Sequence, residues 1–220
     1  MCEPCQNTSA FRAGCFPPLL HAAAPRAELV TETTRDGVTL QLVRGDIAAQ
    51  EDIEAVVNAA NAQLVPGGGV AGALHRAAGH GLLEEARPLA PIRPGEAVLT
   101  GAHDLPNGYV IHALGPVYGR DRPSGELLAR CYREALRRAE EQGVASVAFP
   151  ALSTGSHGYP AEPAVRIALT AVREAMPGLG PVRTVRFVLH NEAARDLHAR
   201  IADEVFGGTV ASGAAPSRRA

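Results

Sequence analysis

The sequence predicts an α/β protein in which helices cover a largely parallel β-sheet, and three observations carry this prediction. Strand-like and helix-like patterns alternate along the chain, which is typical of a layered α/β domain. Two apolar, strand-like segments run directly into glycine-rich loops, and a helical pattern follows each loop. Right-handed crossovers place the carboxyl ends of such strands, and both loops with them, along one edge of the sheet.

Six short segments have the composition of strands. The segment 38–43 alternates apolar and polar residues, as a half-buried strand does, whereas the segments that begin at Ala55 and Ser146 are mostly apolar and predict buried strands. The Leu-Pro-Asn-Gly sequence at 105–108 predicts a turn between two further strands. The predicted strands are 38–43, 55–58, 97–100, 109–112, 146–149 and 182–189.

Five segments predict helices. The clearest is 126–142, where apolar side chains recur on one face and Gly143 ends the pattern. Gly79 closes the first predicted helix, and Pro91 stops the second. The predicted helices are 70–78, 81–90, 126–142, 161–175 and 192–206.

The composition is that of an ordinary globular protein. The chain has 220 residues, of which 46% are hydrophobic and 20% charged, and its net charge is -2. This length predicts one domain, which we place at 36–206 between an N-terminal extension (1–35) and a disordered tail (207–220) rich in Gly, Ala and Ser. The charge balance argues against a broad basic surface, so we expect no nucleic-acid partner. We also expect a monomer.

The N-terminal region lacks the pattern of a secretory signal, and no apolar run is as long as a membrane span. We therefore expect a cytoplasmic protein with free thiols and no membrane partner. Cys2 and Cys5 have the spacing of metal ligands. Either Cys15 and His21 complete a tetrahedral site with them, or the cysteines are incidental; we favour the second interpretation and expect no metal and no cofactor.

Two loops rich in glycine and serine, 58–72 and 153–160, suit an anionic ligand. Backbone N–H groups approach a phosphate closely where no Cβ intervenes, and a helix N-terminus adds partial positive charge. Two such loops facing each other fit a diphosphate better than a single phosphate. Neither loop continues with Gly-Lys-Ser/Thr, which excludes a P-loop. No G-x-G-x-x-G follows the first predicted strand (38–43), where the dinucleotide fingerprint belongs.

Four motifs in a characteristic order make a family resemblance specific. They are Gly45-Asp46-Ile47, Asn58-Ala59-Ala60-Asn61, Gly67-Gly68-Gly69-Val70-Ala71-Gly72-Ala73-Leu74-His75 and Pro150-Ala151-Leu152-Ser153-Thr154-Gly155. Over residues 36–206 the chain resembles a macrodomain of the MacroD-like and viral-type ADP-ribosyl hydrolases. The resemblance implies a three-layer α/β/α fold with a mixed, largely parallel central sheet, and a site that binds ADP-ribose.

The resemblance also implies roles for individual residues. Asp46 would accept a hydrogen bond from the adenine amino group, because a carboxylate only accepts and an exocyclic amine only donates. From the residue alone, Asp46 fits an Asx-turn or an N-cap equally well. Asn61 would contact the distal ribose beside the anomeric carbon, whereas by itself it is typical of a turn at a strand end. The implied catalytic residues are Asn61 and Gly69, and the implied substrate-binding residues are Asp46, Ile47, Asn58, Gly67, Gly68, Val70, Ala71, Ser153, Thr154, Gly155, Ser156, His157, Gly158 and His190.

One departure from the family pattern and four histidines need separate interpretation. Ala71 stands where MacroD-type hydrolases carry an aspartate; viral-type members also lack that aspartate and still hydrolyse ADP-ribosyl esters, the ligand's own phosphate positioning the water. His157 replaces the aromatic over the distal ribose and either packs on it, faces solvent or takes part in catalysis. His190 either stacks on adenine or is a solvated loop residue. We interpret His75 and His112 as structural, with backbone partners for His112.

We therefore expect an ADP-ribosyl hydrolase that removes mono-ADP-ribose from acidic side chains of proteins or hydrolyses small ADP-ribose esters. A reader module that binds ADP-ribose without cleaving it is the alternative, and Ala71 motivates it. A nucleic-acid- or phosphopeptide-binding domain is a third hypothesis, and the charge balance counts against it. The expected partners are ADP-ribose and mono-ADP-ribosylated proteins.

Overall fold

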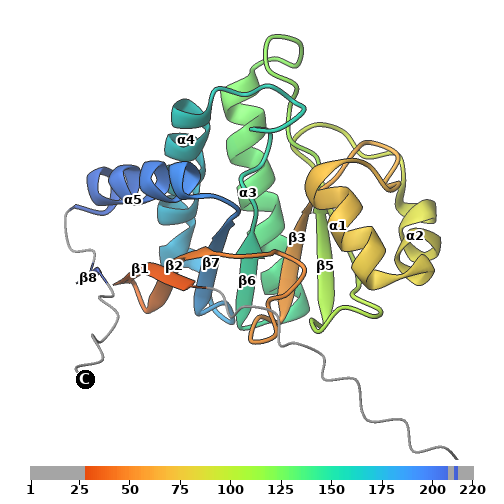
Figure 1. Ribbon diagram of the computed structural model, residues 1–220, viewed down its shortest axis with the longest axis horizontal. Coiled ribbons are helices and arrows are strands. Elements are labelled where there is room, and N and C mark those ends of the chain that lie inside the picture. The colour runs from red at the N-terminus through yellow and green to blue at the C-terminus, as the bar shows by residue number, and fades with distance from the viewer. Residues whose placement is uncertain (1–27, 208–210, 213–220) are drawn as a thin grey trace, which may run out of the picture.

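A mixed β-sheet with helices on both faces forms the body of the protein in a computed structural model that describes residues 28–207 and 211–212 (Figure 1). Within these residues the sheet has eight strands in the order β4-β5-β3-β6-β7-β2-β1-β8. The strands are β1 (Glu28–Arg35), β2 (Val38–Arg44), β3 (Ala55–Ala59), β4 (Ala97–Gly101), β5 (Tyr109–Ala113), β6 (Ser146–Phe149), β7 (Thr184–Leu189) and β8 (Ala211–Ser212).

The middle of the sheet is parallel and its edges are antiparallel. Strands β5, β3, β6, β7 and β2 pair in parallel, whereas β4 joins β5, and β1 joins β2, in antiparallel fashion. The predicted mixed, largely parallel sheet is therefore confirmed. Because parallel strands end at the same edge, the loops after β2, β3, β6 and β7 meet there.

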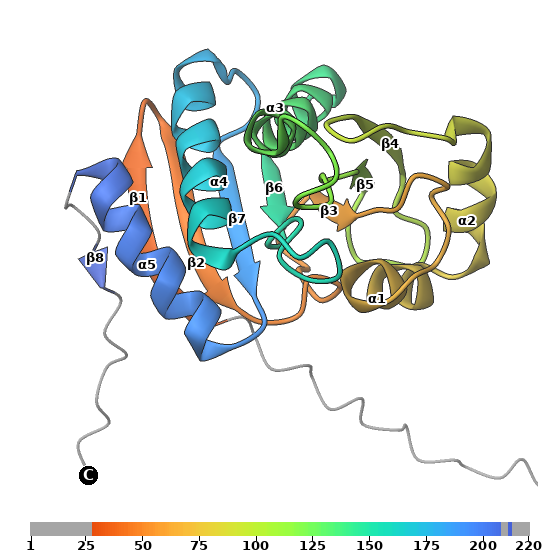
Figure 2. The ribbon, with the colours of Figure 1, turned by 90° about the horizontal axis from the view of Figure 1, so that it is seen from above.

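Helices form the two outer layers, so the predicted three-layer arrangement is also confirmed. Alternate residues of the central strands enter two cores: Val57 packs in the core that includes residues of α3, α4 and α5, and Val56 in the core that includes residues of α1 and α2. Figure 2 shows α1 and α2 beside β3, β5 and β4. The helices are α1 (Gly69–Ala78), α2 (His80–Ala86), α3 (Ser124–Gln142), α4 (Ala161–Ala175) and α5 (Glu192–Phe206), with short 3-10 turns η1 (Arg87–Leu89) and η2 (Met176–Gly178).

The first strand corrects the predicted N-terminal boundary. Residues 28–35, which we assigned to an extension, form β1 and pair with β2 through a hairpin at Asp36-Gly37, whose φ angles are 53° and 77°. Asp-Gly between β-branched runs is a strong hairpin signal, and the few apolar residues of β1 obscured it. In the predicted tail, 211–212 pairs with β1 as β8. The cysteines and histidine of the alternative metal site lie outside the described residues.

Candidate functional site

A cleft of about 720 Å³ lies at the edge of the sheet where the parallel strands end. Four segments line most of it: 45–47 after β2, 68–70 at the start of α1, 150–157 after β6, and 188–190 at the end of β7. We call the loop 60–68 with the start of α1 the first arm, and the loop 150–160 the second arm. The structure brings the two glycine-containing loops together at one edge of the sheet, as predicted.

The first arm presents backbone rather than side chains. The N–H groups of the first helical turn have no intrahelical partner. Gly68, the residue that precedes α1, has no side chain to cap them, so these donors are left uncapped. The arm folds back tightly on its own helix, since a Cβ on Gly72 would overlap the Gly67 carbonyl oxygen. Gly69 has a φ of 57°, the left-handed region that favours glycine. These features leave uncapped donors at the helix N-terminus, which attracts anions.

The second arm is held mostly by its own backbone. The Gly158 N–H donates to the Gly155 carbonyl over 2.9 Å, and the Tyr159 N–H to the Ser153 carbonyl over 3.0 Å. Ser153 has a φ of 64°, and its buried Oγ has no partner among the described residues. That hydroxyl takes the space that a side chain at Gly115 would need. The second arm therefore brings polar groups and bare backbone to the cleft without a cation.

The segment after β2 brings a carboxylate to the opposite end of the cleft. Asp46 is exposed, and one of its oxygens, Oδ1, accepts from the Ala48 N–H over 2.9 Å. The Asx-turn interpretation of Asp46 is thus correct, and it is compatible with a ligand at the second oxygen because a carboxylate has several lone pairs. His190 lies nearby in the lining and pairs with Asn191, whose side chain caps α5.

Ten of the ligand residues that the resemblance implies line this cleft together with Gly69, and five other implied residues do not. The lining group includes Asp46, Ile47, Gly68, Val70, Ser153, Thr154, Gly155, Ser156, His157 and His190. The other five are Asn58, Asn61, Gly67, Ala71 and Gly158, none of which is part of the lining.

The two asparagines have partners within the fold. The Asn61 side chain closes onto the first arm, because its Nδ2 donates to the Val65 carbonyl over 2.7 Å and its Oδ1 accepts from the Val65 N–H. This is the strand-end turn that the residue type alone suggested. Asn58 is 1% exposed, and its Nδ2 donates to His112 Nδ1 over 3.1 Å. These contacts give Asn58 a structural role, and contacts of Asn58 and Asn61 with a ligand stay predictions.

The buried histidines beneath the first arm are neutral. Burial, and secondarily the nearby His75, lowers the pKa of His112 to about 3, and burial also lowers the pKa of His75. With Nδ1 accepting from Asn58, the proton of His112 lies on Nε2, 2.9 Å from Thr100 Oγ1. The structural interpretation of His112 agrees with these contacts, but its partners are side chains rather than the predicted backbone groups. The structural interpretation of His75 stays a prediction.

Sequence reasoning missed the apolar part of the lining. The residues concerned are Ala59, Ala60, Ala73, Leu152, Val188, Leu189 and Ala194. Most of these residues lie in or beside the motifs, or at the end of a strand. The ends of the predicted strands could therefore have identified them from the sequence. Within 28–207 and 211–212, no group of three His, Cys, Asp or Glu side chains is placed to hold a metal ion. No helix among these residues is long and apolar enough to cross a membrane.

These observations define an α/β ligand-binding domain with a nucleotide-sized cleft between two backbone-rich arms. The family model for the Macro domain matches residues 57–168. A macro domain-containing protein of Caldanaerobacter subterraneus is 40% identical over 171 residues, which covers 76% of this chain and 97% of the relative. The chain therefore belongs to the macro domain family.

Two solved structures and one human relative extend this comparison. The Oceanobacillus iheyensis macrodomain with ADP has a TM-score of 0.76 and 32% identity, covering 81% of this chain and 98% of that one. The Trypanosoma brucei macrodomain in complex with ADP-ribose has a TM-score of 0.72 and 35% identity, covering 81% and 78%. Human ADP-ribose glycohydrolase MACROD2 is 49% identical over 138 residues, which are 61% of this chain and 32% of the human protein.

Proposed function

We propose that this macrodomain binds ADP-ribose in the cleft and hydrolyses ADP-ribosyl esters, either on acidic side chains of mono-ADP-ribosylated proteins or in small ADP-ribose esters. The observation that carries the binding proposal is one cleft between two backbone-rich arms, with the uncapped N-terminus of α1 on the side of the first arm. Adenine would lie at Asp46, the diphosphate between the arms, and the distal ribose beside the first arm. The Trypanosoma brucei macrodomain, whose structure was solved with ADP-ribose, supports ADP-ribose as the ligand.

The chemistry of the cleft favours esters over nitrogen-linked substrates. Of the residues that line it, only Asp46, His157 and His190 carry titratable side chains, and Ala71 leaves no carboxylate at the start of α1. Hydrolysis forms a bond between a water oxygen and the anomeric carbon and breaks the bond from that carbon to the carboxyl oxygen. A glutamate leaves as its stable carboxylate, because its pKa is about 4.3, and needs no general acid. An amine or guanidine would leave as a strong base and would need a general acid, a role that we assign to none of these three side chains.

Water activation is the second requirement of the proposal. Without an aspartate at position 71, the phosphate of the ligand would orient the water against the anomeric carbon, and the proton would pass from the water to that phosphate or to solvent. The backbone donors of the two arms would hold the phosphate in the required place. The protein's contribution is then positioning, and the base is part of the substrate.

A non-catalytic reader is the second candidate, and the Asn61 contacts favour it. Both polar atoms of the Asn61 amide are bonded to Val65, so contact with ribose requires that these bonds break or are shared. A domain in which they persist would hold ADP-ribose without approaching the anomeric carbon.

A release assay distinguishes the two candidates. We expect the protein to release ADP-ribose from a glutamate-linked mono-ADP-ribosylated substrate and to leave an arginine-linked substrate intact. Asn61→Ala should slow release by roughly tenfold or more if the amide contacts the sugar in the transition state. Calorimetric binding of ADP-ribose without any release from the glutamate-linked substrate would instead identify a reader.

A wider side chain in the second arm tests the binding site itself. A Cβ at Gly155 meets no atom within 4 Å, so Gly155→Val should leave the fold intact while its methyl groups occupy the space for the diphosphate. We expect the affinity for ADP-ribose to fall about 100-fold, the equivalent of losing charge-assisted hydrogen bonds. Gly178→Ala, at a similarly open position far along the chain in η2, is the matched control and should bind normally. Equal affinities of all three proteins would place the ligand elsewhere.

A further inference from the structure

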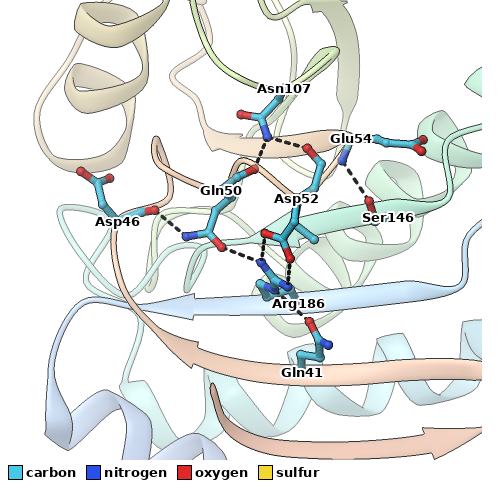
Figure 3. A network of polar contacts seen from close by, with 9 residues as sticks. Gln41, Asp46, Gln50, Asp52, Glu54, Asn107, Ser146 and Arg186 are labelled. Atoms are coloured by element: carbon cyan, nitrogen blue, oxygen red, sulfur yellow. Dashed lines mark hydrogen bonds and ion pairs between the residues drawn. The ribbon is translucent and has the colours of Figure 1, made fainter. Parts of the chain in front are cut away.

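A buried arginine links the sheet to the segment that carries Asp46. Arg186 lies in β7 and is only 7% exposed. Its Nε donates to Gln41 Oε1 over 2.9 Å, and its two terminal nitrogens donate to both carboxylate oxygens of Asp52 over 2.8 and 2.7 Å (Figure 3). A buried guanidinium is tolerated only where such partners are present. The sheet therefore offers a fixed charged donor to the residues that follow β2.

Gln50 transmits this anchor to Asp46. Gln50 is 1% exposed; its Oε1 accepts from Arg186 over 3.0 Å, and its Nε2 donates to the backbone carbonyl of Asp46 over 2.7 Å. The backbone of Gln50 is held as well, since Asn107 Nδ2 donates to its carbonyl over 2.8 Å. Figure 3 shows the carboxylate of Asp46 pointing away from Gln50, while the carbonyl faces it. One side chain thus connects an arginine in the sheet with the backbone of the exposed acidic residue.

We propose that Gln50, oriented by Arg186, is a positioning residue that makes the cleft selective for adenine over purines without a 6-amino group. The inference rests on the proposed function, in which adenine lies at Asp46. A hydrogen bond weakens steeply with distance and angle, so the carboxylate discriminates between bases only if its place is fixed. Asp46 is exposed on a connecting segment, and its own Asx-turn to Ala48 is local. The adjacent Gly45 N–H donates to the Leu189 carbonyl at the end of β7, and the Ala49 N–H donates locally to the Asp46 carbonyl. The tie from Gln50 is the side-chain contact that relates Asp46 itself to the sheet.

Paired titrations with ADP-ribose and inosine diphosphate ribose test this inference. The inosine ligand presents a carbonyl oxygen where adenine presents its amino group, so it cannot donate to Asp46. We expect the wild-type protein to bind ADP-ribose at least about tenfold more tightly than the inosine ligand. Gln50→Met, which has a similar volume but no amide, should reduce this preference to less than about threefold, mainly by weakening ADP-ribose binding.

Two further variants separate positioning from general damage. Gln50→Glu keeps an acceptor for Arg186 but replaces the donor to the Asp46 carbonyl with a repelling oxygen, so the preference should be lost while the thermal midpoint stays near that of the wild type. Gln41→Met is the matched control, because it removes an acceptor of Arg186 without touching the Asp46 segment; it should keep the wild-type preference. In an Asp46→Ala background, Gln50→Met should have no further effect on the preference.

The outcomes distinguish this inference from the proposed function. A wild-type protein that does not prefer ADP-ribose contradicts the placement of adenine at Asp46 and overturns both. A wild-type preference that persists in Gln50→Met and Gln50→Glu overturns the positioning role alone. Loss of the preference in Gln41→Met to the same extent would assign the effect to disrupted packing around Arg186, which also overturns it.

Discussion

The segment that carries Asp46 and the two arms line one cleft, but different groups hold them in place. The Asp46 segment is tied to the sheet by buried side chains, above all Arg186 and Gln50. The arms depend on glycines, short backbone turns and close contact between backbone atoms. A base with a unique donor pattern calls for a fixed acceptor, whereas a diphosphate can be held by several N–H groups at once. If the proposed function holds, this difference lets one cleft select a base at Asp46 and bind an anion between the arms.

The largest expected effect concerns the tight fold of the first arm. Gly72→Ala would drive a Cβ into the Gly67 carbonyl oxygen, a backbone atom that cannot move without opening the arm. We expect the free energy of unfolding to fall by about 3 kcal/mol, measured by urea denaturation. Gly155→Ala is the control in the second arm, where a Cβ meets no atom within 4 Å, and it should stay within about 0.5 kcal/mol of the wild type. Equal effects would show that the arms are not held by close backbone contact.

The next largest expected effect is a loss of folding stability in acid, and it arises from His112 on the side of the first arm. The pKa of His112 in the folded protein is lowered to about 3 by burial and by His75, so protonation favours the unfolded chain. Its contribution to stability is full above pH 6.5 and is lost as the pH falls toward 3; at pH 5 the loss is about 2 kcal/mol. Burial lowers the pKa of His198 to about 4 and adds a loss in the same direction.

A variant assigns this acid sensitivity to its source. His112→Asn removes the titrating group, so the stability difference between wild type and variant should shrink as the pH is lowered from 6.5 to 5. Denaturation curves at several pH values measure this difference. A difference that is constant with pH would mean that His112 is not held neutral.

The smallest expected effect concerns the Asp46 side of the cleft. The hydrogen bonds from Arg186 hold the pKa of Asp52 below its usual value of 3.8, so its stabilising contribution is present above that pH and is lost as the pH falls below it. The Asp52 side chain is 71% exposed, which limits the contribution to about 0.5 kcal/mol. Asp52→Asn should therefore cost little at pH 7 and progressively less as the pH falls below 3.8. A cost that is already lost between pH 6 and 5 would contradict this separation of the two sides.

Most elements could be predicted because their signals are local. The helix 192–206 matches α5 (Glu192–Phe206), and 146–149 matches β6. β1 was missed because it contains few apolar residues, so its composition resembles that of an extension. For the site, the motifs predicted which loops meet. The order of the strands along the chain and the right-handed crossovers place these loops at one edge of the sheet.

The sequence by itself determined that two glycine-containing loops and an acidic segment lie together at one edge of a parallel sheet, because periodicity, glycine content and strand order are local or topological properties. Only the tertiary structure decided which side chains line the cleft and which are bonded within the fold. Asn58 turned into the fold toward His112, Asn61 closed onto Val65, and Arg186, with no motif around it, became the anchor of the Asp46 segment. These outcomes depend on partners far apart in the sequence, which only packing brings within hydrogen-bonding distance.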